Sequence, residues 1–503
     1  MSEYISPETL QEQAVAELHR IEKLLSGNTD GTITPKDRMA IPQQEMPVQE
    51  PTIRAHNIQE VALGYTKEQA LVESQRCLQC KNQPCVTGCP VNVPIPQFIA
   101  QVARGNFKEA VDIIKTTNLL PAICGRVCPQ EKQCQGKCTV GIALKNPEKA
   151  VSIGRLERFV ADYEREHNLQ TVPEVAAETG KKVAVIGSGP AGLTVAADVR
   201  RAGHTVVVFE AFHKTGGVMV YGIPEFRLPK SIVSAEIEML KKMGVQFREN
   251  FLVGRTGTLN QLLQEQGFDA AFIGTGAGLP KFLNIPGENF IGVFSANEYL
   301  TRANLMKAYD TAHADTPLYP AKHVIIVGGG NVAMDAARTA YRLGAEQVTV
   351  IYRRTRNEMP ARREEIAHAE EEGVIFRFLE NPVEVLADSE GRVCGIKALS
   401  YELGEPDASG RRSPVAIPGS EHDIPCDALI VALGNESSPL LQKTTQGLAV
   451  DKKGHIIADE QGKTSLPKVW AGGDIVLGAA TVILAMGEGR KAAASINAYL
   501  KQA

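Results

Sequence analysis

Eight of the ten cysteines of this chain lie between residues 77 and 138, and their spacing is typical of a metal site. The first four follow the pattern C-x2-C-x4-C-x3-C-P, and the second four lie in "CGRVCPQEKQCQGKC". Zinc also binds C-x2-C pairs, but a cysteine followed by proline is typical of ferredoxin loops, and both groups contain one. We therefore predict iron–sulfur clusters, two of them by cysteine count alone. The eight cysteines are Cys77, Cys80, Cys85, Cys89, Cys124, Cys128, Cys134 and Cys138.

The composition is that of a globular protein of 503 residues, 43% of them hydrophobic, which suits about two to four domains. The net charge of -4 is dispersed along the chain and favours neither a nucleic-acid nor a membrane partner. No run approaches the roughly 18 apolar residues of a membrane helix, and the first residues lack the layout of a secretory signal. We expect a cytoplasmic protein, in which clustered cysteines are ligands rather than disulfides. Cys394 and Cys426 lie apart in strand-like runs and are expected to be buried and inert.

A glycine motif follows residue 181. Gly187, Gly189 and Gly192 form G-x-G-x-x-G between a predicted strand and a predicted helix, and Glu210 ends the next strand. The first glycine allows the turn, the second admits a pyrophosphate, and the third lets the helix pack on the strand. Glu210 would accept a hydrogen bond from an adenosine ribose. The stretch therefore predicts a dinucleotide site, with the pyrophosphate at a helix N-terminus.

A second motif has Gly328, Gly330 and Ala333 at the equivalent positions, and its next strand runs into Arg353 and Arg354. A carboxylate there would repel a 2′-phosphate, whereas guanidinium groups would bind it. We therefore predict NADP(H) rather than NAD(H). The alternative is a solvated strand end whose arginines pair with the many nearby glutamates.

The elements that must position these residues fall into two kinds. Up to residue 165 the sequence predicts helices, with the cysteines on loops between them and an extended Pro- and Gly-rich linker after the first helix. From Lys181 short β-branched runs alternate with Ala-rich helices, and this pattern occurs twice. The predicted helices cover 6–25, 66–77, 95–118 and 150–166, and the repeated units cover 182–210 and 323–354.

Near the C-terminus, Asp474 follows a strand and a Gly-Gly pair, and Thr481 opens a final helix. The positive end of that helix would suit the pyrimidine edge of a reduced flavin. Together with the first glycine motif, this segment predicts a discontinuous FAD domain. The fold class is α/β, with two Rossmann-like dinucleotide-binding domains after an α-helical iron–sulfur domain. The expected domains are 1–165, with 1–52 as extension and linker, then 181–296 plus 435–503 for FAD, and 297–434 for NADPH.

The motifs "GSGPAG", "GGGNVAMD", "RRTRNEMPARREE" and "AGGDIVLGAATVILAMGEGRKAA" resemble the small-subunit family of NADPH-dependent glutamate synthase. Its relatives are the large subunit of NADH-dependent ferredoxin:NADP oxidoreductase and the N-terminal half of dihydropyrimidine dehydrogenase. The resemblance covers roughly residues 55–503 and implies FAD in the first unit and NADPH in the second. It also implies that Gly216, Gly217 and Arg227 contact FAD. For Arg227 the alternative is a surface salt bridge.

The same resemblance implies two [4Fe–4S] clusters with interleaved ligands. One cluster would take Cys77, Cys80, Cys85 and Cys138. The other would take Cys89, Cys128, Cys134 and a side-chain oxygen from the motif "VSIGRLER", which here is Glu157. Cys124 is then left over, and it competes with Glu157 for the eighth ligand position.

The resemblance implies an oxidoreductase that passes electrons from NADPH through FAD to the clusters and on to a partner protein, without a side-chain acid or base in catalysis. The partner would be a glutamate synthase large subunit, because we find neither an N-terminal cysteine nucleophile nor an FMN barrel in this sequence. The chain would then serve glutamate biosynthesis. The alternative is the large subunit of an electron-bifurcating NADH-dependent ferredoxin:NADP oxidoreductase, whose partner would be a small flavin and [2Fe–2S] subunit or ferredoxin.

Overall fold

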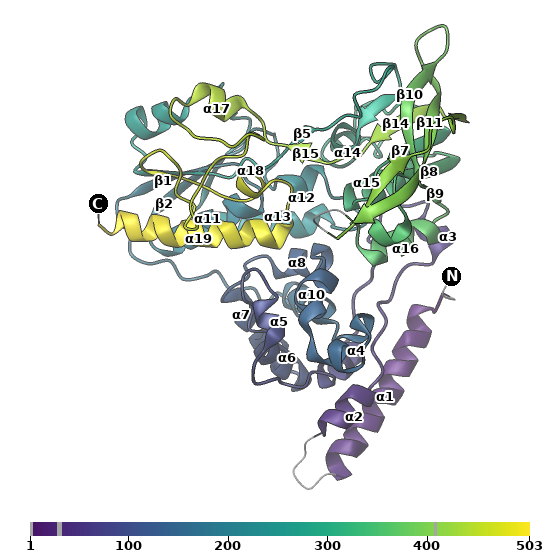
Figure 1. Cartoon of the computed structure of the whole chain (residues 1–503). Coiled ribbons are helices and arrows are strands. Elements are labelled where there is room, and N and C mark those ends of the chain that lie inside the picture. The colour runs from purple at the N-terminus through teal and green to yellow at the C-terminus, as the bar shows by residue number, and fades with distance from the viewer. Residues whose placement is uncertain (1–3, 28–32, 407–409, 503) are drawn as a thin grey trace.

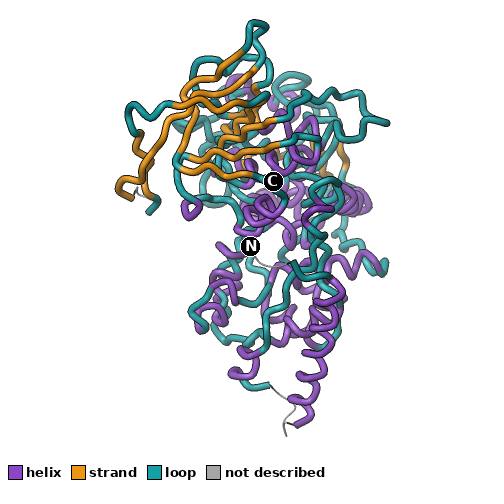
Figure 2. Tube along the Cα trace, turned by 90° about the vertical axis from the view of Figure 1, so that its right-hand side faces the viewer, coloured by secondary structure: helices purple, strands orange, loops and turns teal. Residues whose placement is uncertain are grey.

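The chain folds into a helical domain and two α/β units. The computed structural model describes residues 4–27, 33–406 and 410–502. Figure 1 shows the helical domain below, the first α/β unit at the upper left and the second at the upper right. Figure 2, turned by 90°, shows the strands gathered in the upper half of the molecule. No helix within the described ranges is both long and apolar enough to cross a membrane.

The N-terminal segment, up to residue 54, contains three helices. The N–H of Thr9 donates to Ser6 Oγ over 3.3 Å, so the first helix begins where the sequence predicts. The predicted extended linker, whose residues 28–32 lie outside the described part, contains a short helix. Thr34 caps this helix by accepting from the N–H of Asp37 at 3.2 Å, and this cap corrects the prediction. The three helices are α1 (Pro7–Gly27), α2 (Pro35–Ala40) and α3 (Pro51–Arg54).

The helical domain consists of short helices whose connecting loops carry most of the cysteines. The single helix predicted over 95–118 is two helices, because Gly105 adopts a φ of +78° and ends the first one. The α-helices are α4 (Lys67–Gln75), α5 (Pro84–Thr87), α6 (Ile95–Ala103), α7 (Phe107–Lys115), α8 (Pro121–Val127), α9 (Thr139–Ala143) and α10 (Ile153–Glu166). The 3₁₀ turns are η1 (Gln130–Lys132), η2 (Gln135–Lys137) and η3 (Pro147–Lys149).

The first α/β unit contains a parallel sheet in the order β16-β4-β1-β2-β3. Its outer strand β16 comes from near the C-terminus, so the unit is built from two separate parts of the chain. The strands are β1 (Lys182–Ile186), β2 (Thr205–Phe209), β3 (Gln246–Arg248), β4 (Ala270–Ile273) and β16 (Val469–Ala471). The helices are α11 (Pro190–Arg201), α12 (Val218–Tyr221), α13 (Lys230–Lys242), the π-helix η4 (Gln261–Glu265), α17 (Leu440–Thr444), α18 (Asp474–Leu477) and α19 (Val482–Leu500).

The second α/β unit contains a parallel sheet in the order β6-β14-β7-β8-β9 and a smaller antiparallel sheet that the sequence analysis did not predict. The parallel strands are β6 (Val293–Ser295), β7 (His323–Val327), β8 (Gln347–Tyr352), β9 (Ile375–Phe378) and β14 (Ala428–Val431). The antiparallel strands are β10 (Glu380–Ala387), β11 (Val393–Pro406), β12 (Arg412–Ala416) and β13 (His422–Pro425). The helices are α14 (Ala296–Asn304), α15 (Asn331–Arg342), η5 (Arg356–Glu358) and α16 (Arg363–Glu371).

The chain passes between the two α/β units through one short pair of strands, β5 (Leu279–Pro280) and β15 (Asn435–Glu436). Strand β6 follows this crossing and pairs with β14, so residues 293–295 belong to the second sheet. The boundary predicted between 296 and 297 is therefore too late in the sequence, because three residues of β6 were too short a pattern to recognise as a strand.

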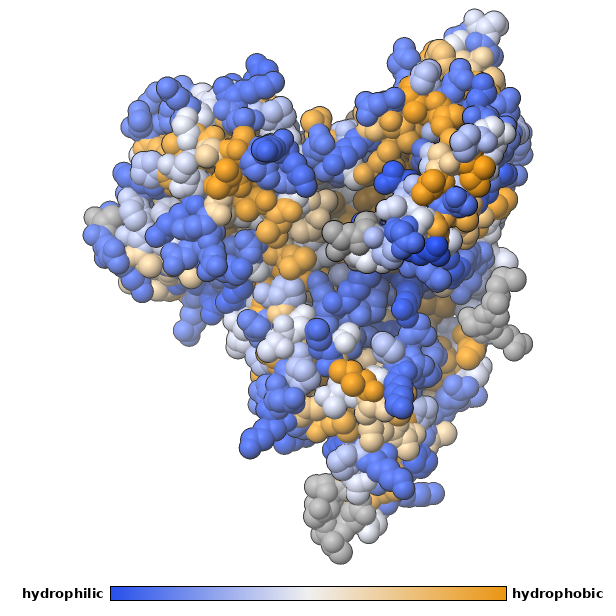
Figure 3. Space-filling view, viewed as in Figure 1, coloured by the Kyte–Doolittle hydropathy of each residue, from blue (hydrophilic) through white to orange (hydrophobic). Residues whose placement is uncertain are grey.

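One apolar core joins the helical domain to the first α/β unit. Phe98 and Ile123 of the helical domain lie in the same buried cluster as Phe272 and Met486 of the first unit. The second unit has separate apolar cores on the two faces of its sheet. Figure 3 shows a hollow between the two upper lobes, with apolar side chains along its margins. The two α/β units are thus packed into the molecule in different ways.

Candidate functional site

The first glycine loop leaves space only where a phosphate group would need it. Gly187 has a φ of +99°, and a Cβ on it would lie 2.5 Å from the carbonyl oxygen of Gly274. A Cβ on Gly192 would overlap the carbonyl oxygen of Gly187, whereas a Cβ on Gly189 would meet nothing within 4 Å. The loop therefore fits a pyrophosphate beside Gly189, at the N-terminus of α11.

A small hydrogen-bond network holds this loop in place. The buried Glu210 carboxylate accepts from the backbone N–H of Ser188 at 3.1 Å and from the Ser188 hydroxyl. The N–H of Gly216 donates to Ser188 Oγ over 2.9 Å, and a Cβ on Gly217 would lie 2.7 Å from Gly189 Cα. The structure thus brings Glu210, Gly216 and Gly217 to the first glycine loop. Ser188, which links them, was missed because a serine between two glycines carries no signal of its own.

The C-terminal segment meets the same loop. Gly473 has a φ of +78°, and a Cβ on it would lie 3.0 Å from the Cβ of Ala191 at the start of α11. Burial raises the pKa of the adjacent Asp474 to about 6, against a backbone hydrogen bond from Ala480 that lowers it. Thr481 caps α19 by accepting from the N–H of Leu484 at 3.3 Å. The two halves of the predicted flavin site are therefore neighbours.

Tyr221 also lies near this site and was not predicted from the sequence. Burial raises the pKa of its phenol to about 12, and the nearby carboxylates of Asp474 and Glu210 add to the shift. The phenol is thus neutral at ordinary pH and lies within electrostatic range of both acids. A lone tyrosine in "VMVYGIP" offers no spacing pattern that could have revealed it.

The second glycine loop has a similar shape. Gly328 has a φ of +140°, and a Cβ on it would overlap the carbonyl oxygen of Ala432. Gly330 is open, because the nearest atom to a Cβ there is Pro360 Cγ at 4.0 Å. Ala333 is fully buried in α15. The space beside Gly330 fits a second pyrophosphate at the N-terminus of α15.

The two arginines after β8 have different surroundings. Arg353 is exposed to solvent. Arg354 is buried, and its Nε donates to the carbonyl oxygen of Arg412 in β12 over 2.7 Å. Arg353 is therefore the guanidinium more accessible to a 2′-phosphate, and Arg354 joins the parallel sheet to the antiparallel one.

Arg227 is part of a buried ion-pair cluster. Its Nη1 lies 2.7 Å from the Asp335 carboxylate and its Nε lies 2.9 Å from Glu365, both in the second unit. The alternative of a surface salt bridge is wrong, because the Arg227 side chain is only 6% exposed. A contact between Arg227 and FAD stays a prediction.

Four of the cysteines form a first group of thiols. Burial, with a smaller contribution from the Cys138 thiolate, raises the pKa of Cys77 to about 11 and of Cys85 to about 12. Cys80 contributes to the shift of Cys77, and its Sγ lies 3.2 Å from Thr139 Oγ1. The loop after η2 thus brings Cys138 to the first three cysteines, so the two sequence groups interleave.

A second group surrounds Glu157. Burial, with smaller contributions from Glu157 and Cys128, raises the pKa of Cys89 to about 11, and the same causes hold the pKa of Cys134 well above its usual value. Burial also raises the pKa of Glu157 to about 8, although Asn118 Nδ2 donates to its carboxylate at 2.6 Å. With pKa values raised in this way the groups stay protonated, and as thiolate and carboxylate ligands they would be stabilised by a positively charged centre between them.

Cys124 lies in the second group as well. A hydrogen bond with Cys128 lowers the pKa of the Cys124 thiol. Burial and the nearby Glu157 raise this pKa by more, so that it lies above its usual value. The Cys124 Sγ lies 3.7 Å from both Asn118 Oδ1 and Met486 Sδ. Glu157 and Cys124 therefore remain in competition for the eighth ligand position.

Both groups have the donor atoms that iron–sulfur clusters take, thiols in the first group and thiols with a carboxyl group in the second. Across the described residues, no three His, Cys, Asp or Glu side chains converge closely enough to hold a single metal ion. In a [4Fe–4S] cluster each thiolate binds a different iron, so the ligands stay farther apart than around one zinc ion. All ten cysteines are free thiols. Cys426 is buried as predicted, but the prediction of burial is wrong for Cys394, which lies at an exposed position of β11.

The second thiol group touches the first α/β unit directly. A Cβ on Gly487 of α19 would lie 3.0 Å from the carbonyl oxygen of Pro90, the residue after Cys89. Gln133, the residue before Cys134, donates to Thr481 Oγ1 at 3.4 Å. The N-terminal turns of α19 thus pack on the loops of the second group.

Comparisons with known proteins agree with this arrangement. Residues 54–169 match the family described as dihydropyrimidine dehydrogenase domain II, 4Fe-4S cluster, and residues 181–489 match the pyridine nucleotide-disulphide oxidoreductase family. The chain is 40% identical over 452 residues to the glutamate synthase (NADPH) small chain of Halomonas elongata, covering 89% of this chain and 94% of that one. It is also 40% identical to the NADP(+)-dependent formate dehydrogenase subunit beta of Moorella thermoacetica. That alignment covers 83% of this chain and 60% of the relative. The solved structure of Mycobacterium tuberculosis FprA in complex with NADPH shares the fold, with a TM-score of 0.53 at 19% identity over 64% of this chain and 85% of that one.

These matches define a pyridine-nucleotide oxidoreductase with an iron–sulfur domain ahead of its nucleotide-binding units, and they give the chain FAD, NADPH and [4Fe–4S] clusters as cofactors. The chain belongs to the glutamate synthase (NADPH) small-chain family.

Proposed function

We propose that this oxidoreductase is the electron-input subunit of an NADPH-dependent glutamate synthase. It would take electrons from NADPH in the second unit, pass them to FAD in the first, and release them through the clusters to a large subunit. The observation that carries this proposal is the contact between α19 and the Cys89 and Cys134 loops, because it joins the predicted flavin site to the second thiol group without an intervening element.

The bound FAD would supply the conversion of a two-electron donor into single-electron transfers. The residues of the chain bind and orient the groups. Gly187, Gly189 and Gly192, with Gly216 and Gly217, would hold the FAD pyrophosphate loop in place, and Glu210 would bind the adenosine ribose. Asp474 and Thr481 would face the flavin ring from the start of α18 and α19.

In the second unit, Gly328 and Gly330 would leave room for the NADPH pyrophosphate, Ala333 would let α15 pack on the sheet, and Arg353 would bind the 2′-phosphate. We propose that Arg354 supports this site by holding β12 against the end of β8. We also propose that the second unit is an insertion between β5 and β15.

For the clusters we propose the interleaved ligand sets. The first is Cys77, Cys80, Cys85 and Cys138, and the second is Cys89, Cys128, Cys134 and Glu157. We place Glu157 in the second set because it lies in the motif "VSIGRLER", which supplies the oxygen ligand in the family that the chain resembles. Free cysteines throughout the chain support a cytoplasmic location.

The proposal is tested by purifying the tagged protein anaerobically from its native cell. We expect about eight iron atoms per chain, bound FAD that NADPH reduces much faster than NADH, and a large co-purifying subunit that carries FMN. A small flavin and [2Fe–2S] partner, or ferredoxin, would instead support the ferredoxin:NADP oxidoreductase alternative. Absence of FAD would refute both.

Two substitutions test the residue assignments. Arg353→Ala should weaken NADPH binding by about tenfold while leaving NADH binding unchanged, because only the charge-assisted 2′-phosphate contact is lost. An equal loss for both nucleotides would exclude the 2′-phosphate role. Glu157→Ala should lower the iron content, and Cys124→Ala should not; the reverse result would make Cys124 the ligand.

A further inference from the structure

Residues 49–62, which we call the strap, contact all three parts of the molecule. The strap links the N-terminal helices to α4 and includes α3. Figure 1 shows α3 beside α16 of the second unit, far from the rest of the helical domain to which the strap returns. No nucleotide motif or cysteine lies in this segment.

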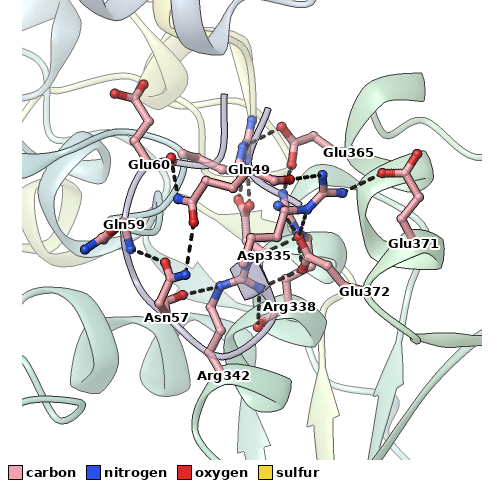
Figure 4. A network of polar contacts seen from close by, with 12 residues as sticks. Gln49, Asn57, Gln59, Glu60, Asp335, Arg338, Arg342, Glu365, Glu371 and Glu372 are labelled. Atoms are coloured by element: carbon pink, nitrogen blue, oxygen red, sulfur yellow. Dashed lines mark hydrogen bonds and ion pairs between the residues drawn. The ribbon is translucent and has the colours of Figure 1, made fainter. Parts of the chain in front are cut away.

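The strap is joined to the second unit by a buried arginine. Arg54 is fully buried, and its Nε lies 3.0 Å from the Glu372 carboxylate and its Nη2 lies 2.6 Å from Glu371. Glu372 is also fully buried and pairs with Arg338 Nη2 at 2.7 Å and Arg342 Nη1 at 2.6 Å. Figure 4 shows the Arg338 and Arg342 side chains converging on Glu372. Three guanidiniums thus share one carboxylate.

The strap backbone adds contacts to both α/β units. Arg342 Nε donates to the carbonyl oxygen of Asn57 at 2.9 Å. The N–H of Val61 donates to the carbonyl oxygen of Phe226, in the first unit, at 2.9 Å. The Phe226 ring in turn lies 4.0 Å from the Arg342 guanidinium and 4.7 Å from that of Arg338. The strap therefore contacts both units at a place where they also contact each other through Phe226, Arg338 and Arg342.

The other end of the strap is held by the helical domain. Glu60 lies 2.6 Å from Arg126 Nε and 3.0 Å from Arg158 Nη2. Arg158 Nη2 also donates to the carbonyl oxygen of Ala62 at 2.8 Å. The domain that carries the cysteines is thus connected to the second unit through a segment fixed at both ends.

The ion-pair cluster around the strap contains equal numbers of positive and negative side chains. Some of its members lie on elements that also form the two glycine loops. Four guanidiniums (Arg54, Arg227, Arg338, Arg342) face four carboxylates (Asp335, Glu365, Glu371, Glu372). Asp335 is on α15, which begins at the second glycine loop, and Arg227 follows the segment that packs on the first one. A buried charge cluster adds little net stability, but it penalises every arrangement that leaves a charge unpaired.

We infer that the strap positions the second unit against the first for hydride transfer, with Arg54 and Glu372 as positioning residues. The inference rests on the proposed roles of the two units. Among the described residues the chain crosses between these units through β5 and β15, and the apolar cores of the units are separate. The charge cluster therefore sets their relative orientation together with the hydrogen bonds from Asn304 Nδ2 to the carbonyl oxygens of Tyr221 and Gly222.

The test is Arg54→Gln in the complete, cofactor-loaded protein. Stopped-flow reduction of the flavin at saturating NADPH should slow by on the order of 10- to 100-fold, because a misplacement of about 1 Å can cost that much. The dissociation constant for NADP+, from isothermal titration, should change by less than about twofold because Arg54 lies outside the proposed nucleotide sites. Arg54→Lys should recover part of the rate. Glu346→Gln, which removes an exposed ion pair with Lys322 on the same unit, is the matched control and should leave the rate unchanged.

Hydrogen exchange shows separately whether the strap has been released. Faster exchange in residues 49–62 and in α16 with a wild-type flavin reduction rate would overturn the inference. If the unmodified protein is not reduced by NADPH, the proposed function fails, whereas a rate loss confined to Arg54→Gln concerns the strap alone. Should Arg54→Gln not fold, Glu371→Gln replaces it under the same criteria, with an expected loss of about threefold since its carboxylate is partly exposed.

Discussion

The two α/β units share the same loop, helix and strand order, yet they are attached to the molecule by different forces. The first unit shares a continuous apolar core with the helical domain, in which Ile123 and Met486 belong to one buried cluster. The apolar cores of the second unit are separate from the core of the helical domain and the first unit. The second unit contacts its neighbours through ion pairs such as Arg54 with Glu372 and Arg227 with Asp335.

The difference matches what each proposed site must do. Electron transfer between the flavin and a cluster needs a fixed separation, and close-packed apolar side chains provide a rigid contact. A nicotinamide nucleotide must enter and leave at every turnover, which calls for an interface that can open. Ion pairs specify one closed arrangement and can be rehydrated when it opens.

The largest expected effect separates the two glycine loops. Gly192→Ala should abolish FAD binding, because its Cβ would overlap the carbonyl oxygen of Gly187. The second loop already carries Ala333 at the matching position, so Ala333→Gly should cost only about 1 kcal/mol of helix stability and keep NADPH binding. Flavin absorbance per chain and NADP+ titration measure the two results. Retention of FAD by Gly192→Ala would show that the loop can relax.

The next effect tests the shared core. Ile123→Ala should destabilise the helical domain and the first unit together by about 2–5 kcal/mol, since it leaves a cavity in one continuous cluster. Ile326→Ala, at an equally buried position of the second unit, should lower the stability of that unit alone. Hydrogen exchange resolved by unit measures both. If Ile123→Ala left the stability of the first unit unchanged, the helical domain and the first unit would not unfold together.

A third substitution decides between two roles for Arg227. Arg227→Gln removes the partner of two buried carboxylates, and we expect flavin reduction by NADPH to slow by about tenfold while the flavin content stays unchanged. Anaerobic stopped-flow and the flavin-to-protein ratio provide the measurements. Loss of flavin would make Arg227 the FAD contact that the resemblance implies.

The smallest effect comes from pH. Burial would raise the pKa of Glu372, but Arg338 and Arg342 hold it well below 4.5, so its contribution is complete above pH 4.5 and is lost only below that. Asp474 in the first unit has its pKa raised to about 6, so its contribution to stability increases as the pH falls from about 7 to 5, by about 1 kcal/mol.

Between pH 7 and 5 the first unit of the flavin-free protein should therefore become more stable relative to its Asp474→Asn variant, while strap exchange around Glu372 stays constant. Exchange rates at the two pH values measure this difference. An identical pH response in the variant would mean that Asp474 is ionised in both states.

The glycine loops could be predicted from the sequence because each depends on residues within about one βαβ unit of one another. The return of the chain to the first unit was predicted from the C-terminal strand, its Gly-Gly pair and Asp474, but the strand order was not, since β16 joins the sheet from nearly two hundred residues beyond β4. The interleaving of Cys138 with Cys77 also came from the resemblance, because eight cysteines alone are equally consistent with two sequential groups.

The strap could not be predicted at all. Arg54 and Glu372 are 318 residues apart in sequence, and neither lies in a pattern that distinguishes a buried ion pair from a solvated one. The antiparallel sheet β10–β13 was missed for a related reason. Its strands are only half-buried and mixed in polarity, so they resemble surface loops between the elements of a parallel sheet.

The paired strands β5 and β15 give the second unit two ends that lie side by side, with Pro280 opposite Asn435. A segment with adjacent ends can be inserted into, or removed from, a host without disturbing its core. Joining residues 279 and 436 by a short turn should leave a smaller flavoprotein that retains its iron–sulfur domain, and a different reductant-binding module could be grafted at the same point. The proposed NADPH site would thus lie in a segment that can be exchanged as a whole.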